Sequence, residues 1–134
     1  MNTSSYSQDY VPPAPILPVS IAIPDKSPET EEYEALVDTG ADATFVPTEM
    51  LEELELPIQY MANVRSHLGD RLHRVPIHRV DIILFGTIRL PSIEVIGDDW
   101  GSQIILGRNV LNKLRIYLNG PDKTTNVEEQ VLAP

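Results

Sequence analysis

The residues with the clearest chemical potential are Asp38, Thr39 and Gly40, which stand together directly after the apolar segment 35–37. A carboxylate at the point where a buried strand leaves the core is partly withdrawn from water, which suits it to acid–base chemistry. Thr39 offers a hydroxyl that can lock the loop, and Gly40 lets a backbone amide approach the carboxylate. Because Asp-Thr-Gly also makes an ordinary turn, the tripeptide needs a second signal.

That second signal lies near the other end of the chain. The apolar run 104–106 is followed directly by Gly107 and Arg108, at the start of an expected short helix. Together with residues 35–42, this pattern resembles the retropepsins, the retroviral-type single-domain aspartic proteases. In that family an Asp-Thr-Gly-Ala-Asp element supplies the catalytic aspartate, and an apolar–apolar–Gly-Arg-Asn/Asp element supports it. The resemblance extends over residues 19–120.

The resemblance implies a role for each matching residue. Asp38 corresponds to the catalytic aspartate, Thr39 to the residue that braces the partner's loop across a dimer axis, and Gly40 to a position that borders substrate. The residues that it places against substrate are Asp42, Leu68, Gly69, Gln103 and Ile105. The residues that it places in structural support of the active loop are Ala41, Gly107 and Arg108. Asp42 is also expected to form an ion pair with Arg108.

Aspartic proteases use two carboxylates that share one proton, one to activate water and the other to protonate the scissile carbonyl. Asp-Thr-Gly occurs once in this chain, so two copies must meet across a two-fold axis to complete the pair. The sequence therefore predicts a homodimeric aspartic endopeptidase that acts on peptides or proteins without a metal or cofactor. A non-catalytic dimeric module that binds peptides or serves as a scaffold, with the same fold, is the alternative.

Composition narrows the function classes further. The chain has 134 residues, with 20 acidic and 10 basic side chains, and its net charge of −10 gives no electrostatic reason to bind nucleic acid or an anionic membrane. The lack of cysteine excludes disulfides, thiolate metal sites and cysteine nucleophiles. No apolar run approaches the roughly 20 residues that a membrane-spanning helix needs. The first ten residues do not have the pattern of a secretory signal, so a cytoplasmic location is expected.

The elements that must position the active loop are short β-strands with turn residues between them. Strands are predicted at 19–23, 33–37, 44–46, 87–90, 92–96, 103–106 and 115–118, with two more within 62–84. Short helices are predicted at 48–56, with Thr48 as the N-cap and Pro57 as the stop, and at 110–114. This pattern predicts a mainly β fold, a small closed barrel of the retropepsin type with one or two short helices.

The chain is divided by composition into three parts. Residues 1–17 are rich in proline and are predicted to be a flexible tail, residues 18–122 form the protease domain, and residues 123–134 are a C-terminal extension. The turn at residues 68–70 resembles the family's flap, a hairpin that closes over substrate. The proline-rich leader, the helix at 48–56 and the continuation past residue 120 look more like the cellular or bacterial branch than the compact viral form.

Four further side chains have plain structural readings. The spacing of His67, His73 and His78 fits no zinc site, so these histidines are expected to face solvent from their strands. Trp100 lies in an acidic loop and is expected to anchor that loop by packing.

Overall fold

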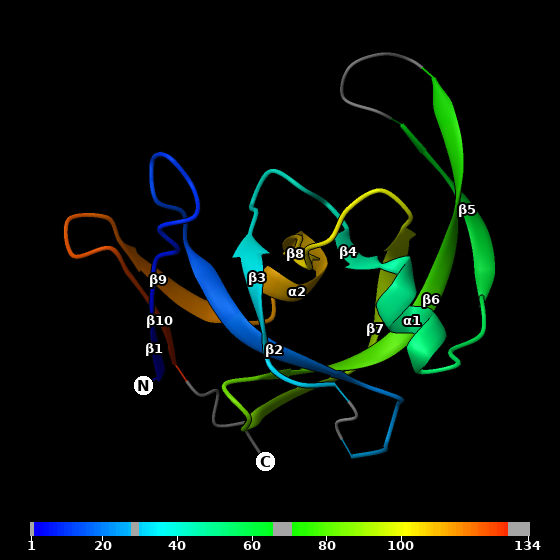
Figure 1. The fold of residues 1–134 in the computed structure, drawn as a ribbon, viewed down its shortest axis with the longest axis horizontal. Coiled ribbons are helices and arrows are strands. Elements are labelled where there is room, and N and C mark those ends of the chain that lie inside the picture. The colour runs from blue at the N-terminus through cyan, green and yellow to red at the C-terminus, as the bar shows by residue number, and fades with distance from the viewer. Residues whose placement is uncertain (1, 28–29, 66–70, 129–134) are drawn as a thin grey trace.

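The computed structural model describes residues 2–27, 30–65 and 71–128. Its elements run in the order shown in Figure 1: β1 (Asn2–Ser5), β2 (Ile16–Ala22), β3 (Tyr33–Val37), β4 (Thr44–Pro47), α1 (Thr48–Glu53), β5 (Tyr60–Arg65), β6 (Leu72–Leu84), β7 (Ile88–Asp98), β8 (Ile105–Leu106), α2 (Arg108–Leu111), β9 (Arg115–Asn119) and β10 (Thr124–Glu128).

Six strands close into a small barrel. They follow the order β2-β3-β8-β4-β7-β6, and β6 pairs back to β2 in an antiparallel register that sets Ile21 beside Ile82. Two of the pairs are parallel, β3 with β8 and β4 with β7, so each of β8 and β7 must be reached by a crossover connection. The predicted mainly β barrel with two short helices is confirmed.

The barrel interior is filled by aliphatic side chains because its strands alternate with a period of two. Leu17, Val19 and Ile21 of β2 are fully buried, while the intervening Pro18 and Ser20 are only half-buried. Burying one such aliphatic side chain contributes about 1.5–3 kcal/mol. The same core includes buried side chains of β3 and β8, so it lies directly beneath the two strands that carry the candidate active loop and its support.

The strands β5 and β6 extend beyond the barrel as an arm (Figure 1, upper right). In β6 the residues 72–74 are exposed, whereas the residues 80–84 are all buried, because only the second half of the strand belongs to the barrel. The two strands of the arm flank residues 66–70, where the flap is expected, and the flap itself stays a prediction. Leu68 and Gly69, expected to contact substrate, lie outside the described residues, so their role stays a prediction.

The prediction of a flexible N-terminal tail is wrong for its first and last residues. Asn2–Ser5 form β1, which pairs with β10 as part of a second sheet in the order β1-β10-β9, and Ile16 and Leu17 already belong to β2. The sequence of β1 is polar and shows no apolar alternation, so a local pattern could not predict the strand. Its stability depends on backbone pairing with residues far away in the chain. Both ends of the chain thus contribute strands outside 18–122, and the limits of the domain itself stay a prediction.

The helices differ from expectation at their ends. Thr48 is the first residue of α1 and does not cap it; its hydroxyl donates to Asp99 Oδ1 at 2.6 Å. The helix ends at Glu53, before Pro57 could stop it. α2 begins at Arg108, earlier than the predicted residue 110. Within the described residues, neither helix is long and apolar enough to cross a membrane.

Candidate active site

The two sequence motifs meet where β3 and β8 lie side by side. The parallel register places Leu36 beside Ile105 and Val37 beside Leu106. The Asp38 N–H then donates to the Leu106 carbonyl oxygen at 3.0 Å. Parallel pairing thus carries Asp38 and Gly107 to the same end of the barrel, although 69 positions separate them in the sequence.

Two backbone N–H groups of its own loop hold Asp38, one at its carboxylate and one at its carbonyl oxygen. The Gly40 N–H donates to Asp38 Oδ1 at 2.9 Å, and the Ala41 N–H donates to the Asp38 carbonyl oxygen at 3.2 Å. A Cβ at residue 40 would lie 3.2 Å from Asp38 Oδ1, which is a tight contact, so glycine suits this close approach. Asp38 is half-buried, whereas Thr39 and Gly40 are exposed. The carboxylate is therefore oriented and still reachable.

Arg108 supports the loop from α2. Its backbone N–H donates to the Ala41 carbonyl oxygen at 2.8 Å, and its Nη1 donates to the Thr39 carbonyl oxygen at 2.8 Å. The expected ion pair with Asp42 is not among the ion pairs of the described residues, and that prediction is wrong. The first turn of α2 lies next to the loop, so the guanidinium meets a backbone carbonyl while Asp42 remains exposed.

Gly107 lies where the chain crosses closely behind the same loop. A Cβ at this position would come within 2.0 Å of the Ala43 carbonyl oxygen. The Gly107 N–H donates to Thr44 Oγ1 at 3.1 Å, and the Thr44 hydroxyl donates to Asn109 Oδ1 at 2.7 Å. Asn109 Nδ2 in turn donates to the Glu94 carbonyl oxygen at 2.9 Å, which links the support to β7.

The sequence reading did not include Thr44 in the site. Thr44 is fully buried at the start of β4, and its hydroxyl ties this strand, which follows the active loop, to Gly107 and Asn109 of the second motif. A hydroxyl within an apolar strand is the signal that could have identified it, because a buried hydroxyl requires partners.

The comparison with protein families decides what this arrangement belongs to. A family model described as "gag-polyprotein putative aspartyl protease" matches residues 29–113, which include both motifs. The chain belongs to this family. Among curated proteins, none matches the chain.

Solved structures share the fold at low sequence identity. A retropepsin-like aspartic protease from Rickettsia conorii is 11% identical with a TM-score of 0.62, and the match covers 92% of this chain and 86% of that one. The retroviral protease-like domain of Ddi1 from Leishmania major is 17% identical with a TM-score of 0.53, over 87% and 90% of the two chains. The Simian Foamy Virus (mac) protease is 22% identical with a TM-score of 0.51, over 72% and 91%. The retropepsin resemblance is confirmed.

Two other candidate residues of this retropepsin-like chain lie on or beside β8. Ile105 is half-buried between β3 and β4, where it pairs with Leu36 and Phe45. Gln103 is half-buried as well, and its Oε1 accepts a hydrogen bond from the Tyr10 hydroxyl. Their contacts with substrate, like those of Asp42, stay predictions.

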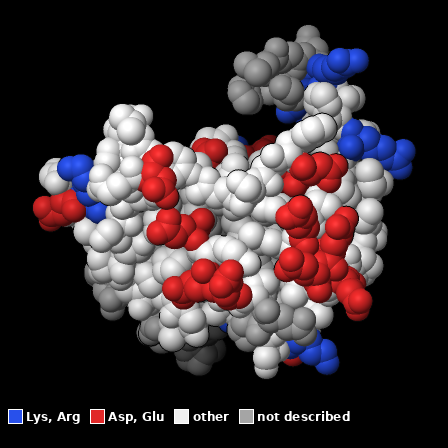
Figure 2. Space-filling model, in the orientation of Figure 1, with Lys and Arg blue, Asp and Glu red and all other residues white. Residues whose placement is uncertain are grey.

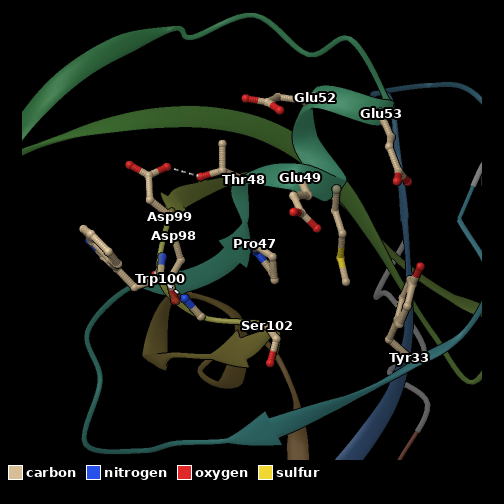
Figure 3. Close-up of a pocket in the computed structure, with 12 residues that line it drawn as sticks. Tyr33, Pro47, Thr48, Glu49, Glu52, Glu53, Asp98, Asp99, Trp100 and Ser102 are labelled. Carbon is tan, nitrogen blue, oxygen red and sulfur yellow. Dashed lines mark hydrogen bonds between the residues drawn. The ribbon is translucent and has the colours of Figure 1, made fainter.

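A cavity of about 510 Å³ lies between α1 and the loop 98–102 (Figure 3). Its acidic lining residues are Glu49, Glu52, Glu53, Asp98 and Asp99. Asp and Glu side chains are prominent on the face of the molecule that Figure 2 shows. Trp100 at its edge is 97% exposed, so the expectation that it anchors the loop by packing is wrong. The loop instead closes on Asp98 Oδ1, which accepts the N–H groups of Trp100 and Gly101 at 3.0 Å each.

The histidines divide between solvent and core. His73 is exposed as expected, and His67 lies outside the described residues. His78 is only 6% exposed, so the expectation that it faces solvent is wrong. Its Nε2 lies 3.5 Å from the position that a Cβ on Gly97 would take, because the glycine leaves room for the ring.

Proposed function

We propose that this chain is an aspartic endopeptidase that works as a homodimer, with one Asp38 from each subunit. The observation that carries the proposal is the state of the Asp38 carboxylate. It is half-buried, its Oδ1 accepts the Gly40 N–H at 2.9 Å, and its loop is held at Thr39 and Ala41 by Arg108. Such orientation serves a group that must meet substrate and water in one geometry.

The chemistry requires two carboxylates that share one proton. The ionised Asp38 takes a proton from a water molecule, whose oxygen attacks the scissile carbonyl carbon, while the protonated Asp38 donates to the carbonyl oxygen. When the tetrahedral intermediate, a gem-diol, collapses, the C–N bond breaks and the leaving nitrogen takes a proton from the pair. One hydroxyl of the gem-diol returns a proton to the pair as the C=O bond re-forms. The products are a carboxylic acid and an amine, and the pair again holds one proton.

The homodimer follows from counting. The chain contains one Asp-Thr-Gly, so a second copy must supply the second carboxylate. Thr39 is exposed next to Asp38, which suits the role that the family resemblance implies for it, contact with the partner's loop. The expected substrate is an extended peptide, held through the active loop and the arm of β5 and β6.

Cleavage of a synthetic peptide library tests the proposal. The parent protein should cleave members of the library and be inhibited by a pepstatin-type inhibitor, and Asp38→Asn should abolish cleavage while the protein keeps its thermal stability. Asp122→Asn makes the same exchange in an exposed turn and should cleave like the parent.

Two outcomes would reject the proposal. Appreciable cleavage by purified Asp38→Asn would show that another group does the chemistry. A parent protein that binds library peptides and cleaves none would support the non-catalytic peptide-binding module instead.

A further inference from the structure

The segment before β2 runs beside the active loop. β2 is antiparallel to β3, with Ile16 opposite Leu36, and the Val37 N–H donates to the Pro15 carbonyl oxygen at 3.1 Å. Val37 immediately precedes Asp38, so the residues just before Pro15 lie next to the place where the chain leaves β3. This segment belongs to the part of the sequence that had been expected to be a flexible tail.

Residues 7–14 form a closed loop there (Figure 1, dark blue). The Ser7 N–H donates to the Ala14 carbonyl oxygen at 2.8 Å, and the Ala14 N–H returns a bond to the Ser7 carbonyl oxygen at 3.2 Å. The buried Ser7 hydroxyl accepts the Asp9 N–H at 3.2 Å. These bonds fix the loop at its base and present Tyr10 and the neighbouring Val11, whose side chain is 98% exposed.

Tyr10 reaches the opposite side of β3. In the barrel β3 lies between β2 and β8, and the Tyr10 hydroxyl donates to Oε1 of Gln103, two residues before β8. The segment before β2 is therefore bonded to β3 itself, at Val37, and to Gln103 on the far side of β3. A mere leader would not need either bond.

In this structure the Tyr10 hydroxyl contacts the oxygen end of the Gln103 amide. Its Oε1 is engaged by the hydroxyl, and within the described part of the chain neither Nε2 hydrogen has an acceptor. An amide held by its oxygen presents its N–H donors. In this arrangement Gln103 directs its N–H donors away from Tyr10, whereas a free glutamine side chain could rotate and offer either group.

We propose that Tyr10 is a positioning residue that sets substrate preference by orienting Gln103 as a donor. The inference rests on the proposed function and on the predicted contact of Gln103 with the peptide. The substrate residue next to Gln103 should carry a neutral acceptor side chain, as Asn, Gln, Ser or Thr do. Asp and Glu should be less favoured because the chain carries a net charge of −10.

The test compares peptides that differ only by Gln or Met, two side chains of similar length, at each position in turn. The parent should prefer Gln to Met at one position by about 3–10-fold in kcat/KM, the ratio expected for one neutral hydrogen bond. Tyr10→Phe keeps the ring and removes the donor, so that ratio should fall toward one, mainly through KM. For Gln103→Glu a third peptide carries Lys at the same position, and this variant should prefer the Lys peptide to the Gln peptide. Tyr6→Phe, the same exchange in the same segment, should keep the parent's ratio.

Because each ratio is measured within one protein, a change in folding or concentration cancels. The same peptides are also titrated against the Asp38→Asn forms of the parent and of Tyr10→Phe, with fluorescence anisotropy as the readout. A parent that cleaves nothing rejects the proposed function, and the binding ratios then decide the present inference. Equal ratios in the parent and Tyr10→Phe, no preference for an acceptor, or no binding at all would overturn it.

Discussion

At the scale of single residues, Asp38 is held by hydrogen bonds from backbone N–H groups. Its carboxylate accepts an amide of its own loop, and Arg108 reaches the loop through carbonyl oxygens. The sequence identified Asp38, Gly107 and Arg108 because residue types and order identify the motifs. It could not identify the partner of Arg108, because the choice between the Asp42 carboxylate and the Thr39 carbonyl depends on distances that appear only after folding.

Arg108→Ala should weaken activity more than stability. Arg108 is exposed, so water competes for its guanidinium, and the loss of its side-chain hydrogen bond should lower the free energy of unfolding by about 1 kcal/mol. A loosened loop should lower kcat/KM by about 10-fold or more. Arg108→Lys should recover part of this loss, since an ammonium can make one bond to Thr39. Thermal unfolding and peptide cleavage are measured together; a mutant that matches the parent in both would exclude this supporting role.

Gly107→Ala should prevent stable folding of the active end. The added Cβ would lie 2.0 Å from the Ala43 carbonyl oxygen, and that oxygen belongs to backbone that cannot rotate away. We expect a loss of more than about 3 kcal/mol in the free energy of unfolding. Gly120→Ala is the matched control, because a Cβ there meets nothing within 4 Å. Equal denaturant midpoints for the two variants would show that the close approach at Gly107 is unimportant.

At the scale of elements, Asp81 joins three segments around β6. Its Oδ1 accepts the Ser92 N–H at 2.8 Å, and its Oδ2 accepts the Asp25 N–H at 3.0 Å and Arg89 Nε at 2.8 Å. Burial raises the pKa of Asp81, but these hydrogen bonds and the Arg89 charge outweigh burial and hold the pKa below its usual value. The carboxylate thus ties β7 and the turn after β2 to the half of β6 that belongs to the barrel.

The lowered pKa of Asp81 has a defined consequence for stability. A carboxyl group whose pKa is lower in the folded state stabilises the fold above its unfolded pKa of about 3.9, and this contribution is lost as the pH falls through the folded pKa. Asp81→Asn should therefore be less stable than the parent at pH 7, and its free energy of unfolding should change less between pH 5 and pH 2. Denaturant unfolding at several pH values measures this. Identical pH profiles in the parent and Asp81→Asn would contradict it.

The elements were predictable where local pattern decides them. β3 was predicted with its observed bounds, 33–37, because an apolar run ends at an obvious turn. The strand β1 was missed, since the polar residues 2–5 are ordered only by pairing with β10. His78 was misread for a related reason. The alternating pattern around it fits a strand with one solvent-exposed face. The residues 80–84 are all buried, however, so this half of β6 has buried side chains on both of its faces.

At the scale of the whole molecule, one chain forms a closed barrel and yet holds half of the proposed catalytic pair. The strands, the arm and the supported loop all lie within one chain, whereas in the proposed mechanism the second carboxylate comes from another copy. The solved structures share this fold at only 11–22% identity. Barrel closure depends on a pattern of apolar residues that many sequences can satisfy, while the active loop depends on a few specific ones.

The most direct test of the shared pair is a mixing experiment. Parent and Asp38→Asn chains are combined in varying ratio at constant total concentration, allowed to exchange subunits, and assayed for peptide cleavage. If activity requires two Asp38 carboxylates, mixed dimers are inactive, and activity falls as the square of the parent fraction, to about one quarter in an equal mixture. A linear fall, to about one half, would show that each chain acts alone and would contradict the account.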